Sequence, residues 1–460
     1  MSLLIHGGTV VNADSKFKAD VLCEGETIVR IATRIDPAEV QADRVIDATG
    51  KMIFPGFIDP HVHIYLPFMG TYAKDTYATA SKAAVVGGTT TMIEMCCPAR
   101  DDEPSEALEL WAGKAEGQSA CDYTFHMGVT RFDDSAEAQL RKIVEQGTRS
   151  FKVFLAYKGA FGVTDDELYG VLRLARELGV VVTAHCENAD LVSALQSKLL
   201  AEGKTGPEWH EPSRPPRVEA EGVHHFCTFL ELTGASGYIV HTSCRDAVEA
   251  ALPFRSRGVD VDLETVIPYL TLDDTYAQRN NFEGAKYVMS PPIRSIDHQA
   301  YLWDALRAGH IATVATDHAP FDFAGQKEMG LPPKGNFTTI PNGIPSVEHR
   351  VTLLWTAGVA AGRLDVHRFV DAASTYAAKR FGLFPRKGVV QLGADADLVI
   401  WDDTYRGKIS ADTHHMATDY SGFEGVEITG RPSLVTVRGS VVADEGRFIG
   451  QLGHGRRLDR

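Results

Sequence analysis

The sequence predicts an α/β protein in which a (β/α)8 TIM barrel carries a small β-sandwich formed by both chain termini. From about residue 53 to 318, short apolar or β-branched runs alternate with amphipathic segments, which is the pattern of βα units around a parallel sheet. Both ends of the chain instead alternate short strands with turn residues. The 460 residues suffice for one large and one small domain, because a barrel alone takes about 250 residues.

Eight apolar runs have the length and composition of the barrel strands. Eight parallel strands close into a barrel, and barrel enzymes place their chemistry at the C-terminal ends of the strands. The runs are MIFPGFI (52–58), TTTMIEM (89–95), YTFHMGV (123–129), SFKVFLA (150–156), VVVTAHC (180–186), GYIVHTS (237–243), VDVDLETVI (259–267) and IATVATDHA (311–319).

Helical periodicity marks the segments between these runs. In DDELYGVLRLAREL (165–178) and VEAEGVHHFCTFLEL (218–232), apolar residues recur three and four positions apart, as expected for helices of the outer ring. Residues 2–50 and 388–448 lack this period and read as short strands joined by turns. We therefore expect three segments: 1–51 and 385–460 form the sandwich and tail, and 52–384 form the catalytic barrel.

Three long connections follow the first, seventh and eighth strands, at residues 64–78, 268–292 and 319–346. All three lie on the expected catalytic face, where long loops are commonly functional. Apolar residues such as Phe68 and Phe321 stand among glycines there. They fit either a lid over a substrate or simple packing on the barrel rim.

Composition restricts the class of partner. The net charge of −15 disfavours nucleic acid, and no basic run interrupts it before the terminal Arg456-Arg457. The N-terminus lacks the features of a signal peptide, and no apolar run approaches the ~20 residues of a membrane helix. Seven cysteines without a C-x-x-C pair argue against a disulfide framework. We expect a cytoplasmic protein that acts on a small molecule.

Histidines gather at the predicted strand ends. His61 and His63 end the first strand and, being two apart, share one face, a spacing suited to two imidazole ligands on one metal. Alone, such a pair is weak evidence, because most are core or surface histidines. However, His185, His241 and Asp317 close the fifth, sixth and eighth strands. The coincidence of these strand ends predicts a metal site in the barrel mouth.

Lys152 is the unusual residue of the fourth strand. Alternation directs Phe151 and Val153 towards the helices and Lys152 towards the candidate ligands. A buried ammonium there would be disfavoured and its pKa lowered. The neutral amine could combine with carbon dioxide to give an anionic carbamate able to bridge two metals. A lysine paired with a carboxylate, or reaching solvent, is the alternative that spacing leaves open.

These motifs together resemble the dihydropyrimidinase and D-hydantoinase family, within the cyclic-amidohydrolase branch of the amidohydrolase superfamily. The resemblance covers nearly the whole chain. Its motifs are residues 57–63 (FIDPHVH), 150–152 (SFK) through 157–159 (YKG), 185–188 (HCEN), 290–294 (SPPIR), 316–318 (TDH) and 341–343 (PNG).

The resemblance implies a homotetrameric hydrolase with two divalent metal ions per subunit, usually zinc. By the resemblance, His61, His63 and Asp317 hold one metal, and His185 and His241 hold the other. Lys152, modified to N6-carboxylysine by carbon dioxide, bridges the two metals. The resemblance further implies that Tyr157 donates to the oxyanion, that main-chain groups at Ser290 and Asn342 bind the cyclic amide, and that Asp317 transfers the proton.

The implied activity is hydrolytic ring opening of dihydropyrimidines or 5-substituted hydantoins, in the class EC 3.5.2.- and most closely EC 3.5.2.2. A hydroxide held between the two metals would attack the ring amide. Ring size, exocyclic substituent, enantiomer preference and the physiological metal depend on the loops and are not readable from these motifs.

Related activities differ at single positions. Dihydroorotases carry an arginine two residues after the second histidine, where this chain has Tyr65. Allantoinases generally lack a tyrosine at the position of Tyr157. Deaminases of the superfamily lack the lysine that corresponds to Lys152. An allantoinase-like hydrolase of another cyclic ureide remains an alternative. A non-catalytic assembly protein of the collapsin response mediator type is another, although those proteins have lost metal ligands that this chain keeps.

Overall fold

Eight parallel strands form one of the two large sheets in the structure, a computed structural model that describes residues 2–460. Every residue of the first three strands is buried, since helices cover the outside and side chains fill the inside. The strands, in sheet order, are β6 (Phe57–Val62), β9 (Thr89–Cys96), β10 (Asp122–Gly128), β11 (Ser150–Lys158), β12 (Val181–His185), β13 (Ser236–Ile239), β14 (Val261–Val266) and β15 (Thr313–Ala315).

Backbone hydrogen bonds close this sheet into a barrel just beyond the ends of β6 and β15. Asp317 N donates to His61 O at 3.0 Å, and His63 N donates to His318 O at 2.8 Å. The seam therefore joins the first strand to the chain that follows the last, as a barrel requires. The bonds that close the barrel also bring His61, His63 and Asp317 together.

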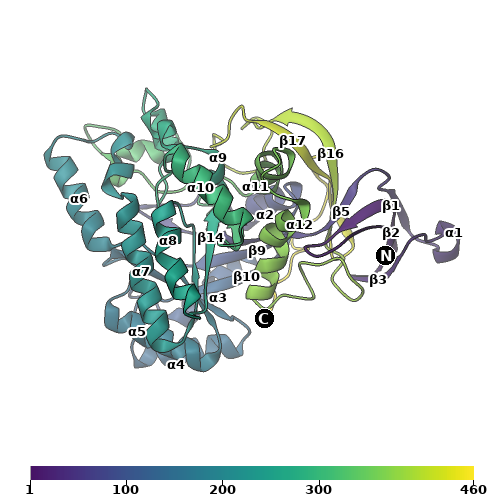
Figure 1. Cartoon of the computed structure of the whole chain (residues 1–460), viewed down its shortest axis with the longest axis horizontal. Coiled ribbons are helices and arrows are strands. Elements are labelled where there is room, and N and C mark those ends of the chain that lie inside the picture. Colours follow the sequence, from purple (N-terminus) through teal and green to yellow (C-terminus); the bar gives the residue numbers. More distant parts are fainter. Residues whose placement is uncertain (1) are drawn as a thin grey trace.

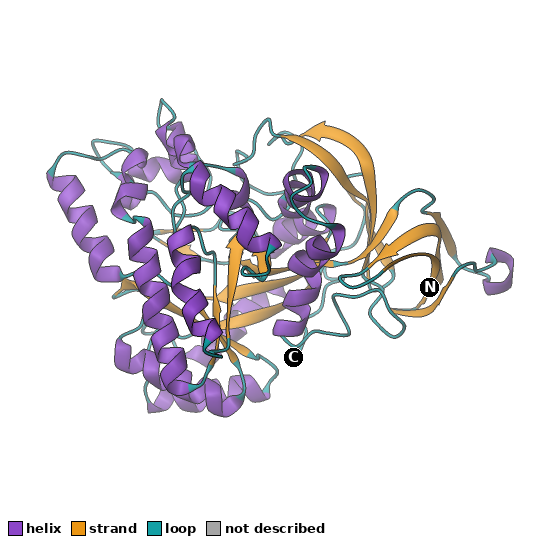
Figure 2. Cartoon of the chain, viewed as in Figure 1, coloured by secondary structure: helices purple, strands orange, loops and turns teal. Residues whose placement is uncertain are grey.

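Helices surround the barrel, as Figures 1 and 2 show. The helix expected at 165–178 is α5 (Asp165–Leu178), which begins with a Thr164 and Glu167 capping box and ends at Gly179. The helix expected at 218–232 lies within α7 (Pro216–Thr233). The others are α2 (Tyr77–Val86), α3 (Pro104–Ala115), α4 (Asp134–Glu145), α6 (Ala189–Ala201), α8 (Arg245–Ser256), α9 (Ile267–Thr271), α10 (Ile296–Arg307), α11 (Arg350–Leu354), α12 (Val366–Val370) and α13 (Tyr376–Arg380).

The chain termini form one nine-stranded sheet, to the right in Figure 1. Both halves contribute to one apolar core, which contains Ile5 and Val21 from the N-terminal part and Leu398 and Leu434 from the C-terminal part. The predicted fold class is therefore confirmed, with a short helix α1 (Pro37–Val40) added. The strands are β1 (Ser2–Val11), β2 (Lys16–Glu24), β3 (Thr27–Ala32), β4 (Arg44–Asp47), β5 (Met52–Pro55), β16 (Leu398–Lys408), β17 (Glu427–Val437), β18 (Ser440–Asp444) and β19 (Arg447–Phe448).

One predicted strand is divided between the two sheets. The prediction of a single barrel strand over residues 52–58 is wrong, because β5 pairs with β1 and β16 in the terminal sheet and the barrel strand starts only at Phe57. Between them lies Gly56, where any side chain would collide with Thr90 of the neighbouring strand. The apolar run is continuous across this point, so its periodicity gave no sign of the break.

The three long connections all reach the mouth of the barrel. The first contains a two-stranded hairpin, β7 (Pro67–Phe68) and β8 (Thr71–Tyr72). The second contains most of α9 and short 3-10 helices, and the third contains short 3-10 helices. Phe68, Ser290 and Asn342, one residue from each connection, line the same pocket. Phe321 belongs to the apolar packing beneath that rim instead. None of the helices within residues 2–460 combines the length and hydrophobicity needed to cross a bilayer.

Candidate active site

Two histidines and one carboxylate converge at the seam of the barrel. The Nε2 atoms of His61 and His63 lie 3.3 Å apart, and Asp317 Oδ1 lies 3.2 Å from each of them. All three side chains are buried, and their ligand atoms lie within 4.8 Å of one another. Imidazole nitrogens and a carboxylate oxygen in this arrangement suit a divalent metal ion.

Glu264, on β14, contacts His61 on the side of the ring that faces away from His63 and Asp317. Its Oε1 lies 2.8 Å from His61 Nδ1, so the imidazole is oriented with Nε2 towards the cluster. A histidine that binds a metal usually donates its other ring N–H to a carboxylate or another acceptor in this way. Burial lowers the pKa of His61 well below its usual range, which favours the neutral imidazole that a metal requires.

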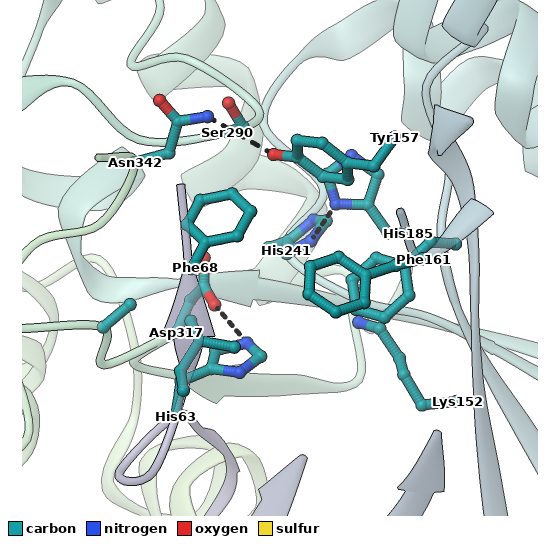
Figure 3. Close-up of a pocket in the computed structure, with 13 residues that line it drawn as sticks. His63, Phe68, Lys152, Tyr157, Phe161, His185, His241, Ser290, Asp317 and Asn342 are labelled. Atoms are coloured by element: carbon teal, nitrogen blue, oxygen red, sulfur yellow. Dashed lines mark hydrogen bonds and ion pairs between the residues drawn. The ribbon is translucent and has the colours of Figure 1, made fainter. Parts of the chain in front are cut away.

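A second pair of histidines lies at the ends of β12 and β13. His185 Nδ1 is 2.9 Å from His241 Nε2 (Figure 3). The other nitrogen of His185 lies 2.7 Å from Glu187 Oε2. The same carboxylate oxygen accepts a hydrogen bond from Arg214 at 2.6 Å. Burial opposes the ionisation of Glu187, but Arg214 and then His185 outweigh it and lower its pKa to about 2.

Lys152 points into the barrel from β11, among these histidines. Its side chain is fully buried, and its Nζ has no hydrogen-bond partner within residues 2–460. Burial lowers its pKa, which favours the neutral amine. The alternatives of a paired or solvent-reaching lysine do not match this geometry. An unpartnered amine between two groups of metal-ligand atoms fits the predicted carbamate bridge, and the residues present therefore fit a two-metal centre.

A pocket opens over these groups. Leu66, Phe68, Phe154 and Phe161 form the apolar wall of its lining, and polar groups make up most of the rest. Figure 3 shows Phe68 and Phe161 among these polar side chains. This combination of an apolar surface with a few directed polar groups is typical of a small-molecule site. Its lining consists of His63, Leu66, Phe68, Lys152, Phe154, Tyr157, Phe161, His185, His241, Ser290, Asp317, Ala319 and Asn342.

Tyr157 projects its hydroxyl into this pocket. Asn342 Nδ2 donates to that hydroxyl at 3.4 Å, and the Arg214 guanidinium lies 5.5 Å from the centre of the ring. Burial raises the pKa of Tyr157, so the hydroxyl retains its proton and can act as a hydrogen-bond donor. The structure thus brings Tyr157, Ser290 and Asn342 to one side of the pocket.

Backbone strain concentrates at the same place. Tyr157, His241 and Asp317 have φ angles of 60°, 41° and 50°, in a region that side chains rarely adopt. Strain of this kind persists where the surrounding structure enforces it, and it clusters at functional sites. The predicted strands over 237–243 and 311–319 accordingly stop early, at Ile239 and Ala315, so that the chain can turn these side chains inwards.

The supporting residues Glu187, Glu264 and Arg214 were not predicted. Glu187 lies two positions after His185, and Glu264 is a charged residue inside an apolar run, so both left a signal in the sequence. Arg214 left none, because it lies in an irregular segment. Tyr65, compared above with the arginine of dihydroorotases, packs on Trp111 and Lys114 outside the pocket lining.

Comparisons with known proteins agree with this geometry. The amidohydrolase family model matches residues 52–442. A D-hydantoinase from Geobacillus stearothermophilus is 45% identical over 461 residues, covering 100% of this chain and 97% of that protein. The structure of a D-hydantoinase (dihydropyrimidinase) from Thermus sp. superposes with a TM-score of 0.97 at 61% identity, covering 100% of this chain and 99% of the other. A dihydropyrimidinase from Brevibacillus agri superposes with a TM-score of 0.97 at 42% identity, with coverage of 100% and 99%.

These matches extend over the barrel and the terminal sheet alike. They agree with the resemblance drawn from the motifs alone. The chain therefore belongs to the amidohydrolase family, within its dihydropyrimidinase and D-hydantoinase branch.

Proposed function

We propose that this chain opens the ring of dihydropyrimidines or 5-substituted hydantoins by hydrolysing the ring amide. The observation that carries the proposal is the fully buried Lys152 amine, which has no hydrogen-bond partner within residues 2–460 and lines one pocket with His63, His185, His241 and Asp317. The full-length relatives include D-hydantoinases and dihydropyrimidinases, which supports this substrate class over allantoin. An assembly role without catalysis is not favoured, because the potential ligand atoms are all present.

His61, His63 and Asp317 would hold one metal ion, and His185 and His241 the other, with carboxylated Lys152 shared between them. When bound, such ions lower the pKa of coordinated water and polarise the ring carbonyl. Zinc suits this donor set, and manganese and cobalt are compatible with it. The orphan Nζ of Lys152 and the converging Nε2 atoms of His61 and His63 support the assignment.

Asp317 would move the proton. Burial opposes its ionisation, but the neighbouring His61 and His63 outweigh this and lower its pKa, so the carboxylate is charged and can accept a proton. From its position on the pocket wall, it would take the proton of the attacking water and pass it to the departing ring nitrogen. The ring C–N bond then breaks, and the opened product carries the new carboxylate at one end and the protonated nitrogen, as the NH2 of a carbamoyl group, at the other.

Tyr157 would stabilise the negative charge that develops on the ring carbonyl oxygen. A preorganised donor at such a position is worth about 3 to 4 kcal/mol. The Asn342 amide donates to the same hydroxyl oxygen, which leaves the hydroxyl proton available to a substrate oxygen. Main-chain groups at Ser290 and Asn342 would bind the ring amide and fix its orientation, while the apolar wall would hold the ring substituent.

The direct test compares ring opening of dihydrouracil, 5-substituted hydantoins and allantoin by the metal-loaded protein. We expect turnover of the first two and little of allantoin. Exclusive turnover of allantoin would replace this proposal with the ureide alternative. Absence of turnover after reconstitution with zinc or manganese in bicarbonate would favour the assembly protein.

We further propose a homotetramer in the cytoplasm and a division of the chain near residues 51 and 384, with the adjoining strand β5 kept on the side of the terminal sheet. All seven cysteines are buried and free, which suits a reducing compartment. Sedimentation velocity tests the tetramer, and limited proteolysis tests the boundaries.

A further inference from the structure

A second fully buried lysine lies near the pocket, outside the candidate metal ligands. Lys327 stands in the connection between β15 and α11, and its side chain has no exposed surface. Its Nζ donates to the carbonyl oxygens of Val288, at 2.8 Å, and Pro341, at 2.6 Å. Burial lowers its pKa well below the usual range of lysine. A buried amine that serves two carbonyl groups is costly, so its position needs an explanation.

Both carbonyl groups belong to segments that supply the polar side of the pocket. Val288 lies two residues before Ser290, and Pro341 directly precedes Asn342. Ser290 and Asn342 line the pocket, although they come from different connections. The Lys327 amine is therefore a direct link between the two segments.

A backbone hydrogen bond also joins the two segments, but the Pro341 carbonyl still depends on Lys327 for its donor. Gly343 N donates to Val288 O at 2.9 Å, so that oxygen accepts from both Gly343 and Lys327. Gly343 has a φ of 151° and approaches Ala319 so closely that a side chain would collide with its carbonyl. Pro341 O accepts from Lys327, and no backbone hydrogen bond to it is found within residues 2–460.

The surroundings of the amine are buried and largely apolar. Val288 and Ile340 belong to an apolar cluster with Leu199, Ala285 and Phe337. Removing the amine would leave the Pro341 carbonyl without its donor and the Val288 carbonyl with Gly343 N alone, and a shift of the Pro341 segment would relieve this cost. A shift of that kind would change the distance between the main chain at Ser290 and at Asn342.

We propose that Lys327 is a positioning residue for substrate recognition: its amine ties the segment of Ser290 to the segment of Asn342 and fixes the spacing of the groups that bind the ring amide. This inference rests on the proposed function, since it concerns the same pocket. Lys327 itself does not line the pocket, so it acts through its two neighbours.

The test replaces Lys327 by methionine in the full-length, metal-loaded enzyme, with dihydrouracil and a 5-substituted hydantoin as substrates. Methionine keeps an unbranched apolar stem, one atom shorter, but can make neither hydrogen bond. We expect kcat/KM to fall at least about tenfold, mostly through KM, because displaced main-chain groups at Ser290 and Asn342 would bind the ring amide less tightly. Metal content should stay at the wild-type value. Amide hydrogen exchange should quicken in residues 288–290 and 341–343.

Lys286→Met is the matched control. Lys286 lies in the same region, but its Nζ pairs with Glu283 at 2.5 Å and lies 4.6 Å from the Phe323 ring centre. We expect its kinetic constants to remain within about twofold of wild type, as is usual for a site outside the machinery. Lys327→Gln keeps two N–H donors on a shorter stem and should recover part of the loss in KM.

The outcomes separate the two proposals. If the wild-type enzyme opens no cyclic amide, the proposed function fails. If it does and Lys327→Met keeps the wild-type KM and kcat below its melting temperature, only the positioning role is overturned. A kinetic loss equal to that of Lys286→Met would also overturn it, as would failure of both Lys327 variants to fold, which would assign the residue to folding.

Discussion

A lysine is buried at each end of the barrel, but only one of the two amines pairs with carboxylates. At the mouth, the Lys152 amine has no hydrogen-bond partner within the described chain, residues 2–460. At the opposite end, Lys387 Nζ lies 2.7 Å from Asp122, 2.9 Å from Asp395 and 2.7 Å from Asp397. Both side chains are at most 2% exposed.

The difference separates structural from chemical roles. Lys387 joins the start of β10 to the terminal sheet, and its three carboxylates compensate the desolvated charge. Lys152 lacks such compensation and stands where a cation would oppose metal binding. A buried amine in that position is stable when it is neutral or when it has become an anion, which is why we assign chemistry to one lysine and folding to the other.

The largest expected effect comes from Lys152→Ala. Loss of a shared ligand should remove more activity than the about 100-fold that loss of a supporting partner costs. Metal content per subunit, measured by elemental analysis, should fall. Short carboxylic acids such as acetate should restore part of both, because they can stand in for the carbamate.

Lys158→Ala is the control for that variant, since Lys158 lies on the same strand but pairs at the surface with Asp190. It should keep wild-type activity and metal content. A fully active Lys152→Ala enzyme would contradict the bridge.

Lys387→Met should act on stability instead. Breaking a buried ion pair leaves unpaired carboxylates and costs about 3 to 5 kcal/mol of the free energy of unfolding. Denaturant unfolding would measure this, with exposed Lys379→Met as the control. The folded variant should keep its kcat/KM and metal content. A loss of activity without a loss of stability would contradict the structural role assigned to Lys387.

Tyr157→Phe should lower kcat about 100- to 1000-fold, because one oxyanion donor is removed. Metal content and folding should remain unchanged, since the ring keeps its packing against Phe68 and His185. Steady-state kinetics at saturating substrate are the measurement. An unaltered kcat would exclude Tyr157 from the oxyanion role.

The smallest effect concerns a peripheral, partly exposed pair. The hydrogen bond to Glu348 raises the pKa of His415 above its usual value, although burial opposes this. The protonated form is thus favoured in the folded protein, and its contribution is full below pH about 6.5 and disappears as pH rises through the raised pKa. His415→Gln should reduce stability by less than about 1 kcal/mol at pH 5.5 and leave it unchanged near pH 9. Urea midpoints that differ equally at both pH values would contradict the assigned titration.

The sequence was sufficient to predict the barrel and most of the groups in its mouth. Period-two alternation predicted the inward direction of Lys152, and the H-x-H spacing predicted that His61 and His63 share a face. These are local properties of a strand. The approach of Asp317 to His61 depends on barrel closure, and it became predictable only because strand ends meet at one rim.

The rest depends on contacts that no local pattern records. The break at Gly56 follows from the close approach of Thr90, and the turns at His241 and Asp317 follow from enforced left-handed backbone. Lys327 resembled an ordinary polar loop residue in the sequence, since its two carbonyl acceptors come from distant segments. Tertiary structure decides each of these features.

The proposed chemistry depends on a Lys152 amine that is carboxylated and shared by two metal ions. The most direct measurement is carbon-13 NMR of metal-loaded protein equilibrated with labelled bicarbonate, combined with a metal count per subunit. We expect one carbamate signal, absent from Lys152→Ala, together with two bound ions. A fully active enzyme with two ions and no carbamate signal would contradict the account.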